Sequence, residues 1–295
     1  MRRAGSGFER ILTLPFFANR IDPELLSRLN FPVPTKIIAV ANQKGGVGKT
    51  TTVVNVAACM AAAGHRTLLF DLDPQANATS GIGFEKVEGA SAYRPLLGEG
   101  NLQDKIQQSA FKNLDVIPSE VDLCAVEIEM IRGENHLKKA AELLAPIVQS
   151  GVYEVVLIDC PPALGVITLN AFGAADGILV PLQCEYYALE GISMIHRVID
   201  PIRQTGVNPR LALLGVVMTM YDARIKLANQ VVAEVRQHFG ELVFETMIPR
   251  TTRLAEAPSF GKPIIHYDPY SAGASAYEVL TLEILKKLKT PSKDK

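Results

Sequence analysis

The chain is poor in aromatic residues: tryptophan is absent, and aromatic residues make up 6% of its 295 residues. Proteins that bind single-stranded nucleic acid by stacking its bases depend on exposed aromatic side chains, so this composition argues against that class. A formal net charge of −1 excludes a polybasic binder of the histone kind. It leaves room for a local basic patch on an assembled dimer.

Cysteine is also scarce, and the four residues are Cys59, Cys124, Cys160 and Cys184. None forms a C-x-x-C pair, and no histidine cluster accompanies them, so a structural zinc site is not expected. The pattern favours reduced, mostly buried thiols in a cytoplasmic protein. A cluster shared across a dimer could still use single cysteines, which leaves Cys124 and Cys160 open as iron–sulfur ligands.

Long hydrophobic runs are missing, since no apolar stretch approaches the roughly 20 residues that span a bilayer. Near the N-terminus, Arg2, Arg3 and Arg10 flank the apolar stretch 11–17, which Pro15 interrupts. Because no A-x-A cleavage site follows, a secretory signal is not expected. The Arg-rich, acid-poor composition leaves a transit peptide as an alternative.

Residues 1–35 differ in composition from the rest of the chain. They contain four prolines, and the first 36 residues hold six basic against three acidic residues. We expect a partly disordered N-terminal extension with one short helix near 22–29, where Asp22 is the candidate N-cap and Pro23 the first helical residue. One domain, residues 36–290, and a flexible tail, 291–295, follow.

From residue 36 onward, short apolar runs alternate with segments of helical periodicity. The runs predict strands at 37–41, 67–72, 114–117, 155–158, 177–182, 211–218 and 242–247; the helices are expected at 50–63, 121–132, 137–148, 169–175, 188–203, 225–239 and 275–289. Continuous apolar strands are typical of sheets covered on both faces. The predicted fold class is α/β: one doubly wound, mostly parallel sheet flanked by helices, with its ligand beyond the carboxyl ends of the strands.

A glycine-rich loop connects the first predicted strand to the first helix. The candidate nucleotide-binding residues are Lys44, Gly45, Gly46, Val47, Gly48, Lys49, Thr50 and Thr51. Backbone N–H groups of such a loop surround phosphate oxygens, Lys49 would reach the β- and γ-phosphates, and the Thr50 hydroxyl would hold Mg²⁺. The ordinary pattern has glycine where this chain has Gln43, and Lys44 is an additional lysine. With such a loop, the expected fold is that of a P-loop NTPase.

The sequence of this loop resembles the deviant Walker A loop of the ParA/MinD class of ATPases. Three further stretches, 70–80, 184–191 and 248–259, narrow the resemblance to the ParA/Soj branch, which partitions chromosomes and plasmids. The similarity covers residues 36–288. Residues 1–35 match nothing expected of that family.

The resemblance implies a role for several of these residues. Lys44 is expected to reach the nucleotide of the partner in an ATP-bound homodimer and to stabilise charge on the transferred phosphoryl group, as an arginine finger does. Asp71 and Asp73 leave the end of a strand on the same face; Asp73 is the candidate for orienting the attacking water, and Asp71 for Mg²⁺ or for support of its site. Asp159 follows a Walker B-like strand and is a further Mg²⁺ ligand candidate.

The late part of the domain carries the candidates for adenine and DNA binding. Pro249 would present a flat apolar surface to the base. Residues 203–262 hold eight basic against five acidic residues. Arg224 and Arg253 occupy positions at which the family binds DNA without sequence preference, and Lys226 is a plausible helper; such contacts are to phosphates.

The function implied is an ATP- and Mg²⁺-dependent DNA-partitioning ATPase with slow intrinsic turnover, located in the cytoplasm on the nucleoid. A ParB-type centromere-binding partner would stimulate hydrolysis and release the dimer from DNA. The alternatives are a ParA-like positioner of a protein cargo, a nucleotide sensor without turnover, and a MinD-like membrane-cycling ATPase. The last would use the apolar residues of helix 275–289, but Val279, Leu282 and Leu285 widen this face as packing requires, so stable membrane association is not expected.

Overall fold

A computed structural model describes residues 34–130, 136–185 and 188–289 of the chain. In these ranges the chain forms an eight-stranded sheet with the order β3-β4-β2-β5-β1-β6-β7-β8. The strands are β1 (Lys36–Val40), β2 (Thr67–Asp71), β3 (Gln107–Gln108), β4 (Leu114–Ile117), β5 (Val155–Asp159), β6 (Gly177–Gln183), β7 (Ala212–Tyr221) and β8 (Val243–Pro249). All neighbouring strands are parallel except β3, which is antiparallel to β4. The predicted fold class is therefore confirmed.

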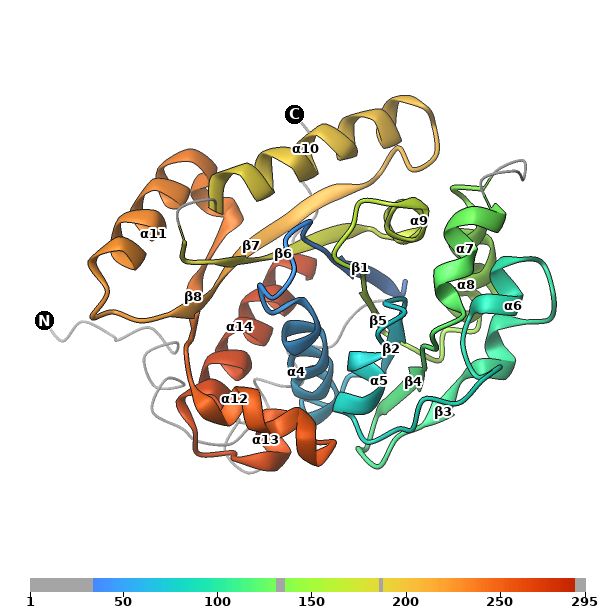
Figure 1. Cartoon of the computed structure of the whole chain (residues 1–295), viewed down its shortest axis with the longest axis horizontal. Coiled ribbons are helices and arrows are strands. Elements are labelled where there is room, and N and C mark those ends of the chain that lie inside the picture. The colour runs from blue at the N-terminus through green and yellow to red at the C-terminus, as the bar shows by residue number, and fades with distance from the viewer. Residues whose placement is uncertain (1–33, 131–135, 186–187, 290–295) are drawn as a thin grey trace, which may run out of the picture.

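Helices cover both faces of this sheet. They are α4 (Lys49–Ala62), α5 (Asn77–Gly81), α6 (Tyr93–Leu96), α7 (Leu123–Glu129), α8 (Lys139–Gln149), α9 (Val166–Ala174), α10 (Ala188–Gln204), α11 (Lys226–Phe239), α12 (Thr252–Glu256), α13 (Ile264–Tyr267) and α14 (Ala272–Lys289). Figure 1 shows α4 and α14 on one side of the sheet and α9 and α10 on the other. Because strand side chains alternate, Ile37 and Ala39 of β1 join one apolar core, and Ile38 and Val40 join the other.

Each of the seven strands and seven helices predicted from residue 36 onward has a counterpart in the described residues. Strand β3, whose two residues are both glutamine, was not predicted, nor were the short helices α5, α6, α12 and α13. Helices of four or five residues are too short to show a 3.6-residue period, and a polar edge strand has no apolar run. The predicted helix at 22–29, the residues 1–33 of the extension and the tail 291–295 lie outside the described ranges.

The C-terminal helix α14 packs onto the sheet beside α4. Tyr277, Leu280 and Ile284 are each no more than 1% exposed. The apolar face of α14 is therefore used for packing, as the width of that face predicted. Within the described ranges, no helix combines the length and apolarity that a membrane crossing requires.

The C-terminal end of helix α9, the helix that follows β5, is held by the buried side-chain amide of Asn208. Asn208 donates from Nδ2 to the carbonyl oxygens of Phe172 at 2.9 Å and Ala175 at 2.7 Å. The exposed Asn229 makes a comparable pair of bonds, from Nδ2 to the carbonyl oxygens of Ala223 at 2.9 Å and Ile225 at 3.1 Å. The two amides thus differ mainly in their access to water.

Asn208→Ala should lower the free energy of unfolding by about 1–3 kcal/mol, because two buried carbonyl groups lose their donor and no water replaces it. Asn229→Ala should cost less than about 1 kcal/mol, since water can reach the same groups there. Urea unfolding followed by circular dichroism measures both. Equal costs for the two variants would contradict the role of burial.

Candidate functional site

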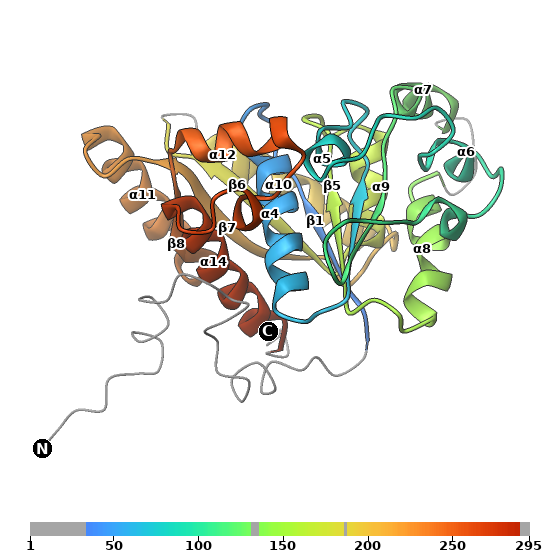
Figure 2. The same ribbon diagram turned by 90° about the horizontal axis from the view of Figure 1, so that it is seen from below.

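The candidate site lies at the carboxyl ends of β1, β2 and β5. In the parallel register, Val40 at the end of β1 is level with Asp159 at the end of β5, and Asp71 at the end of β2 is level with the same Asp159. The glycine-rich loop that follows β1 therefore opens beside both carboxylates. Figure 2 shows this loop along one edge of the molecule, with α12 on one side and α5 and α7 on the other.

The loop conformation depends on glycine and on two side-chain hydrogen bonds that link the segment after β1 to β6 and β7. Gly46 and Gly48 have φ angles of 73° and 91°, in the left-handed region that favours glycine. Asn42 donates from Nδ2 to the Pro181 carbonyl at 2.8 Å, and Thr219 donates from Oγ1 to the Val47 carbonyl at 2.8 Å. The roles of Asn42 and Thr219 were not predicted, because their partners are 139 and 172 residues away in the sequence.

Lys49, the first residue of α4, points its ammonium group into this loop. Its side chain is buried, and Nζ donates to the Lys44 carbonyl oxygen at 3.0 Å. Burial lowers the pKa of Lys49, while the charges of Asp159 and Asp73 oppose that shift. A buried cation at the N-terminus of a helix, within a loop of backbone N–H groups, suits a phosphate ligand.

Asp159 is the most unusual polar group of the site. It is fully buried, and among the described residues neither carboxylate oxygen has a hydrogen-bond partner of normal distance and angle. Burial, and then the charge of Asp71, raise the pKa of Asp159, while the nearby Thr50 hydroxyl and the Lys49 charge lower it. Buried carboxylates without partners are rare in native proteins and call for an explanation.

A magnesium ion fits this arrangement. Mg²⁺ is usually bound through one or two protein oxygen ligands, together with waters and substrate phosphates. The unpaired oxygens of Asp159 and the Thr50 hydroxyl are of the right chemical kind. In the described part of the chain, no group of three or more His, Cys, Asp and Glu residues could hold a metal by itself.

The oxygens of Asp71 are already used inside the protein. Oδ1 accepts from the Asp73 N–H at 3.1 Å, and Oδ2 accepts from the N–H and the hydroxyl of Thr79 at 2.8 and 2.7 Å. Burial raises the pKa of Asp71 to about 6 although these bonds lower it. Of the two roles expected for Asp71, this geometry favours support of the site over direct coordination of Mg²⁺.

An apolar pocket lies next to the loop. Its volume is about 300 Å³, and its lining residues are Gly48, Thr51, Thr219, Met220, Ile248, Pro249, Arg250, Thr251, Leu254, Ala255 and Tyr277. The pocket is of the size that small ligands occupy. Pro249, the residue proposed for adenine, therefore lines a cavity that shares Gly48 and Thr51 with the phosphate loop.

Lys44 is half-exposed and forms an ion pair within its own chain. Its Nζ lies 2.6 Å from Glu185 Oε2. Gln183, at the end of β6, donates from Nε2 to the other oxygen of Glu185 at 2.6 Å. Glu185 lies in one of the stretches that resemble the ParA/Soj branch, but its contact with Lys44 was not predicted.

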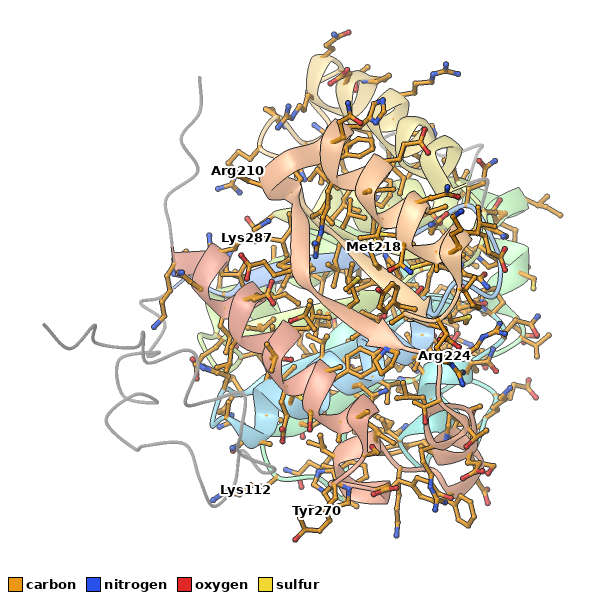
Figure 3. The ribbon with its side chains drawn as sticks, turned by 90° about the vertical axis from the view of Figure 1, so that its left-hand side faces the viewer. Lys112, Arg210, Met218, Arg224, Tyr270 and Lys287 are labelled. Atoms are coloured by element: carbon orange, nitrogen blue, oxygen red, sulfur yellow. The ribbon has the colours of Figure 1, made fainter. Side chains whose placement is uncertain are left out.

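Two of the three candidate DNA-binding residues are also paired with carboxylates. The exposed Arg224 donates from Nε and Nη2 to the two oxygens of Asp222 at 2.9 and 2.7 Å, and its position on the surface is seen in Figure 3. The hydrogen bonds from Arg224 lower the pKa of Asp222 to about 2. Lys226, at the start of α11, is exposed.

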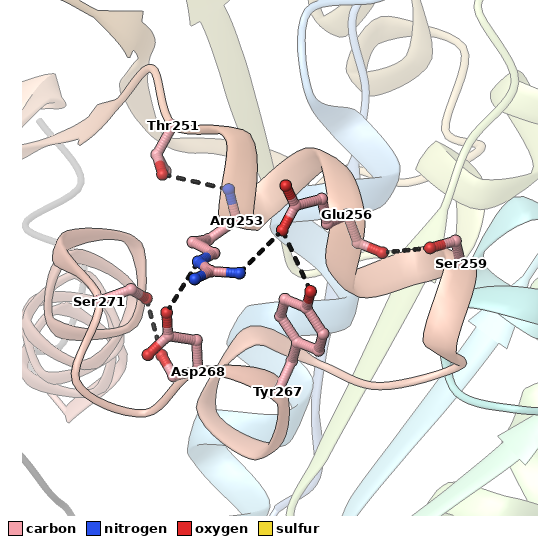
Figure 4. A network of polar contacts seen from close by, with 7 residues as sticks. All are labelled: Thr251, Arg253, Glu256, Ser259, Tyr267, Asp268 and Ser271. Atoms are coloured by element: carbon pink, nitrogen blue, oxygen red, sulfur yellow. Dashed lines mark hydrogen bonds and ion pairs between the residues drawn. The ribbon is translucent and has the colours of Figure 1, made fainter.

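Arg253 belongs to a network of polar contacts on α12 and α13. It lies 3.1 Å from Glu256 and 3.2 Å from Asp268, and Tyr267 donates its hydroxyl to Glu256 at 3.1 Å (Figure 4). Arg224 and Arg253 follow the adjacent strands β7 and β8, so both lie beyond the same edge of the sheet as the phosphate loop.

The four cysteines are unpaired thiols, as predicted. Cys59, Cys160 and Cys184 are buried, and Cys124 is exposed. Burial raises the pKa of Cys160, which lies beside Asp159 and Lys49. Of the two residues left open as iron–sulfur ligands, Cys160 has no surface to share with a partner.

Asp159→Asn should stabilise the nucleotide-free protein and abolish its response to Mg²⁺ with ATP. Since the pKa of Asp159 is raised in the fold, its ionisation costs folding free energy as the pH rises above the ordinary carboxyl value of about 4. Thermal unfolding at pH 7 should show a higher Tm for the variant, and the difference should vanish near pH 4. Addition of Mg²⁺ and ATP together should raise the Tm of the parent protein but not that of the variant.

Asp176→Asn is the matched control, because Asp176 Oδ2 accepts a hydrogen bond from the Ile37 N–H at 2.9 Å. It should leave the response to Mg²⁺ and ATP intact and should not raise Tm. An Asp159→Asn variant that retains this response would remove Asp159 from the metal site.

Comparison with known proteins identifies the family. Residues 35–213 match the family described as an AAA domain. The chain is 46% identical over 254 residues to the chromosome partitioning protein ParA of Myxococcus xanthus, covering 85% of this chain and 88% of that protein. It is 48% identical over 253 residues to the sporulation initiation inhibitor protein Soj of Bacillus subtilis, covering 84% and 98%.

Among solved structures, a Mycobacterium smegmatis protein named cobyrinic acid a,c-diamide synthase, with bound ADP and magnesium, is similar in fold. It is 35% identical with a TM-score of 0.75, covering 87% of this chain and 96% of that chain. The partition proteins are the more similar in sequence, and they cover nearly the same share of the chain. The chain belongs to the ParA/Soj family of chromosome-partitioning ATPases.

Proposed function

We propose that this protein is an ATPase that partitions DNA by cycling between an ATP-bound dimer on DNA and free monomers. ATP and Mg²⁺ close the dimer, the dimer binds DNA without sequence preference, and a ParB-type centromere-binding partner stimulates hydrolysis and release. The observation that carries the nucleotide chemistry is the unpaired, buried Asp159 carboxylate beside Lys49 and Thr50. The relatives named ParA and Soj support the role in partitioning.

The residues of the phosphate loop would bind and orient the triphosphate. Backbone N–H groups of Gly45 to Gly48 and the ammonium of Lys49 bind its phosphate oxygens, and Thr50 and Asp159 hold Mg²⁺. When bound, Mg²⁺ neutralises phosphate charge and favours displacement at the γ-phosphorus. Asp73 orients the attacking water, and Pro249 lines the pocket for the adenine.

Lys44 would complete the site of the partner subunit rather than its own. Its ion pair with Glu185 must first break, and an exposed pair of this kind contributes only about 0–1 kcal/mol. A triphosphate, with several negative charges, competes well for the same ammonium. The monomer therefore hydrolyses ATP slowly, and dimerisation supplies the missing cation.

DNA binding would use Arg224, Lys226 and Arg253. In the monomer, carboxylates pair with Arg224 and Arg253 and hold both side chains beyond the edge of the sheet at which the phosphate loop lies. DNA phosphates would replace these carboxylates as the partners of the two arginines. Such contacts are electrostatic, so affinity falls steeply with salt and ignores sequence. Through these contacts the protein would reside on the nucleoid in the cytoplasm.

The buried apolar face of α14 favours DNA over a membrane as the surface on which the protein cycles. A MinD-like protein inserts the apolar side of such a helix into lipid. Here Tyr277, Leu280 and Ile284 are buried in the core.

The proposal also divides the chain into an extension, 1–35, an ATPase domain, 36–290, and a tail, 291–295.

Lys44→Ala should abolish the stimulated ATPase activity, because neither site of the dimer then receives a cation from its partner.

Glu185→Gln should raise basal turnover severalfold, since it removes the carboxylate that holds Lys44 in the monomer. The measurement is phosphate release with and without DNA and the ParB-type partner. Parent-like hydrolysis by Lys44→Ala would exclude the role in trans, whereas unchanged basal turnover in Glu185→Gln would exclude only the restraint by Glu185.

Arg224→Glu should reduce DNA affinity roughly tenfold at low salt while ATP binding is unchanged, because a phosphate contact becomes a repulsion. The matched control is Arg210→Glu: Arg210 is exposed as well, but precedes β7 while Arg224 follows it (Figure 3). Electrophoretic mobility shifts with DNA of any sequence measure both. Equal losses in the two variants would indicate an effect of net charge rather than a binding surface.

A further inference from the structure

We propose that Thr79 and Ser119 are positioning residues for the carboxylate of Asp73. This inference rests on the proposed function, in which Asp73 orients the attacking water. Neither side chain would touch the water or the nucleotide; both act by holding the segment that carries Asp73. Thr79 comes from α5, and Ser119 follows β4.

In the segment between β2 and α5, both polar groups of the Asp73 backbone form hydrogen bonds. The N–H of Asp73 donates to Asp71 Oδ1 at 3.1 Å. Its carbonyl oxygen accepts from the Ser119 hydroxyl at 2.6 Å and from the Ala76 N–H at 2.8 Å. One carboxylate oxygen, Oδ1, accepts from the Gln75 N–H at 2.9 Å.

The Thr79 hydroxyl joins the other members of this network. It donates to Asp71 Oδ2 at 2.7 Å and accepts from the Ser119 N–H at 2.8 Å, so it uses both capacities of a hydroxyl group. Asp71, Thr79 and Ser119 are all fully buried. Because water has no access, a lost bond in this network would not be replaced.

The backbone of the same segment is strained, which explains why it needs several restraints. Ala76 is a buried non-glycine residue with φ 51° and ψ 39°. Left-handed conformations of such residues cost of order 1 kcal/mol and persist only where surrounding contacts determine them. Without the Thr79 hydroxyl, the segment is expected to relax and to carry the Asp73 carboxylate with it.

Positioning at this level matters for the reaction itself. Phosphoryl transfer depends on orientation and electrostatic stabilisation, and a displacement of about 1 Å can cost roughly 10²-fold in rate. Nucleotide binding, in contrast, uses the loop after β1 and the pocket beside β8, and in the described part of the chain neither Thr79 nor Ser119 is hydrogen-bonded to a residue of that loop or pocket. Loss of the Thr79 or Ser119 hydroxyl should therefore lower the rate of hydrolysis while leaving the affinity for ATP nearly unchanged.

The test compares Thr79→Val, Thr79→Ser and Ser119→Ala in the full chain. Thr79→Val keeps the shape but removes the hydroxyl, and should lower kcat for ATP in the presence of DNA by roughly 10- to 100-fold. The Kd for a fluorescent ATP analogue should stay within about twofold of the parent value, since the binding groups are intact. Thr79→Ser restores the hydroxyl and should recover most of kcat. Ser119→Ala, which keeps its backbone N–H, should lower kcat in the same way.

Thr67→Val is the matched control. Thr67 is a fully buried threonine at the other end of β2, and its hydroxyl donates to the His65 carbonyl at 3.0 Å. It should keep the parent kcat. If Thr79→Val does not fold, Ser119→Ala with its single lost bond decides the matter.

Parent-like kcat in both Thr79→Val and Ser119→Ala would overturn the proposal. It would also be overturned if kcat and ATP affinity fell together and Thr79→Ser recovered neither, because that result describes a purely structural role. Asp73→Ala separates this inference from the proposed function. Parent-like turnover in Asp73→Ala would remove the role of Asp73, whereas loss of turnover in that variant alone would remove only the role of Thr79 and Ser119.

Discussion

The parallel register of β1, β2 and β5 is the constraint on which the site depends. Since these strands run in the same direction and are in step, Val40, Asp71 and Asp159 end at the same edge of the sheet. A shift of one residue in either pairing would turn the terminal side chains to opposite faces. The apolar cores on the two faces of the sheet hold this register, so packing far from the nucleotide site sets its geometry.

Two buried carboxylates, those of Asp71 and Asp159, lie at this edge of the sheet, where their charge does not stabilise the fold. Asp71 and Asp159 are fully buried, and burial raises the pKa of both, so each destabilises the protein when ionised. Asp71 is compensated by Thr79 and by the backbone of its own loop. Asp159 has charged neighbours and the Thr50 hydroxyl nearby but, among the described residues, no hydrogen bond of normal geometry. The difference separates a carboxylate that builds the site from one that is available to a ligand.

Three exposed cations proposed to meet anionic partners, Lys44, Arg224 and Arg253, share one feature: each pairs with a carboxylate of its own chain. Lys44 pairs with Glu185, Arg224 with Asp222, and Arg253 with Glu256 and Asp268. Exposed ion pairs are weak, so they hold a side chain in place without preventing its exchange. A triphosphate or a DNA backbone carries enough negative charge to displace such carboxylates, which couples binding to the breaking of contacts within the monomer.

The amino-acid pattern was sufficient for the sheet and for the place of the glycine-rich loop, Asp73 and Asp159 at or just beyond strand ends, because apolar runs, glycine spacing and strand-end carboxylates are local signals. The roles of these residues stay predictions. The pattern was not sufficient for β3, the short helices, or the contacts of Asn42, Thr79, Ser119, Glu185 and Thr219. These residues act through partners distant in sequence, as in the bond from Thr219 to Val47 or the pair of Lys44 with Glu185. Only the packed sheet brings such partners together, since a single polar side chain carries no periodic signal that would reveal where its hydrogen bond goes.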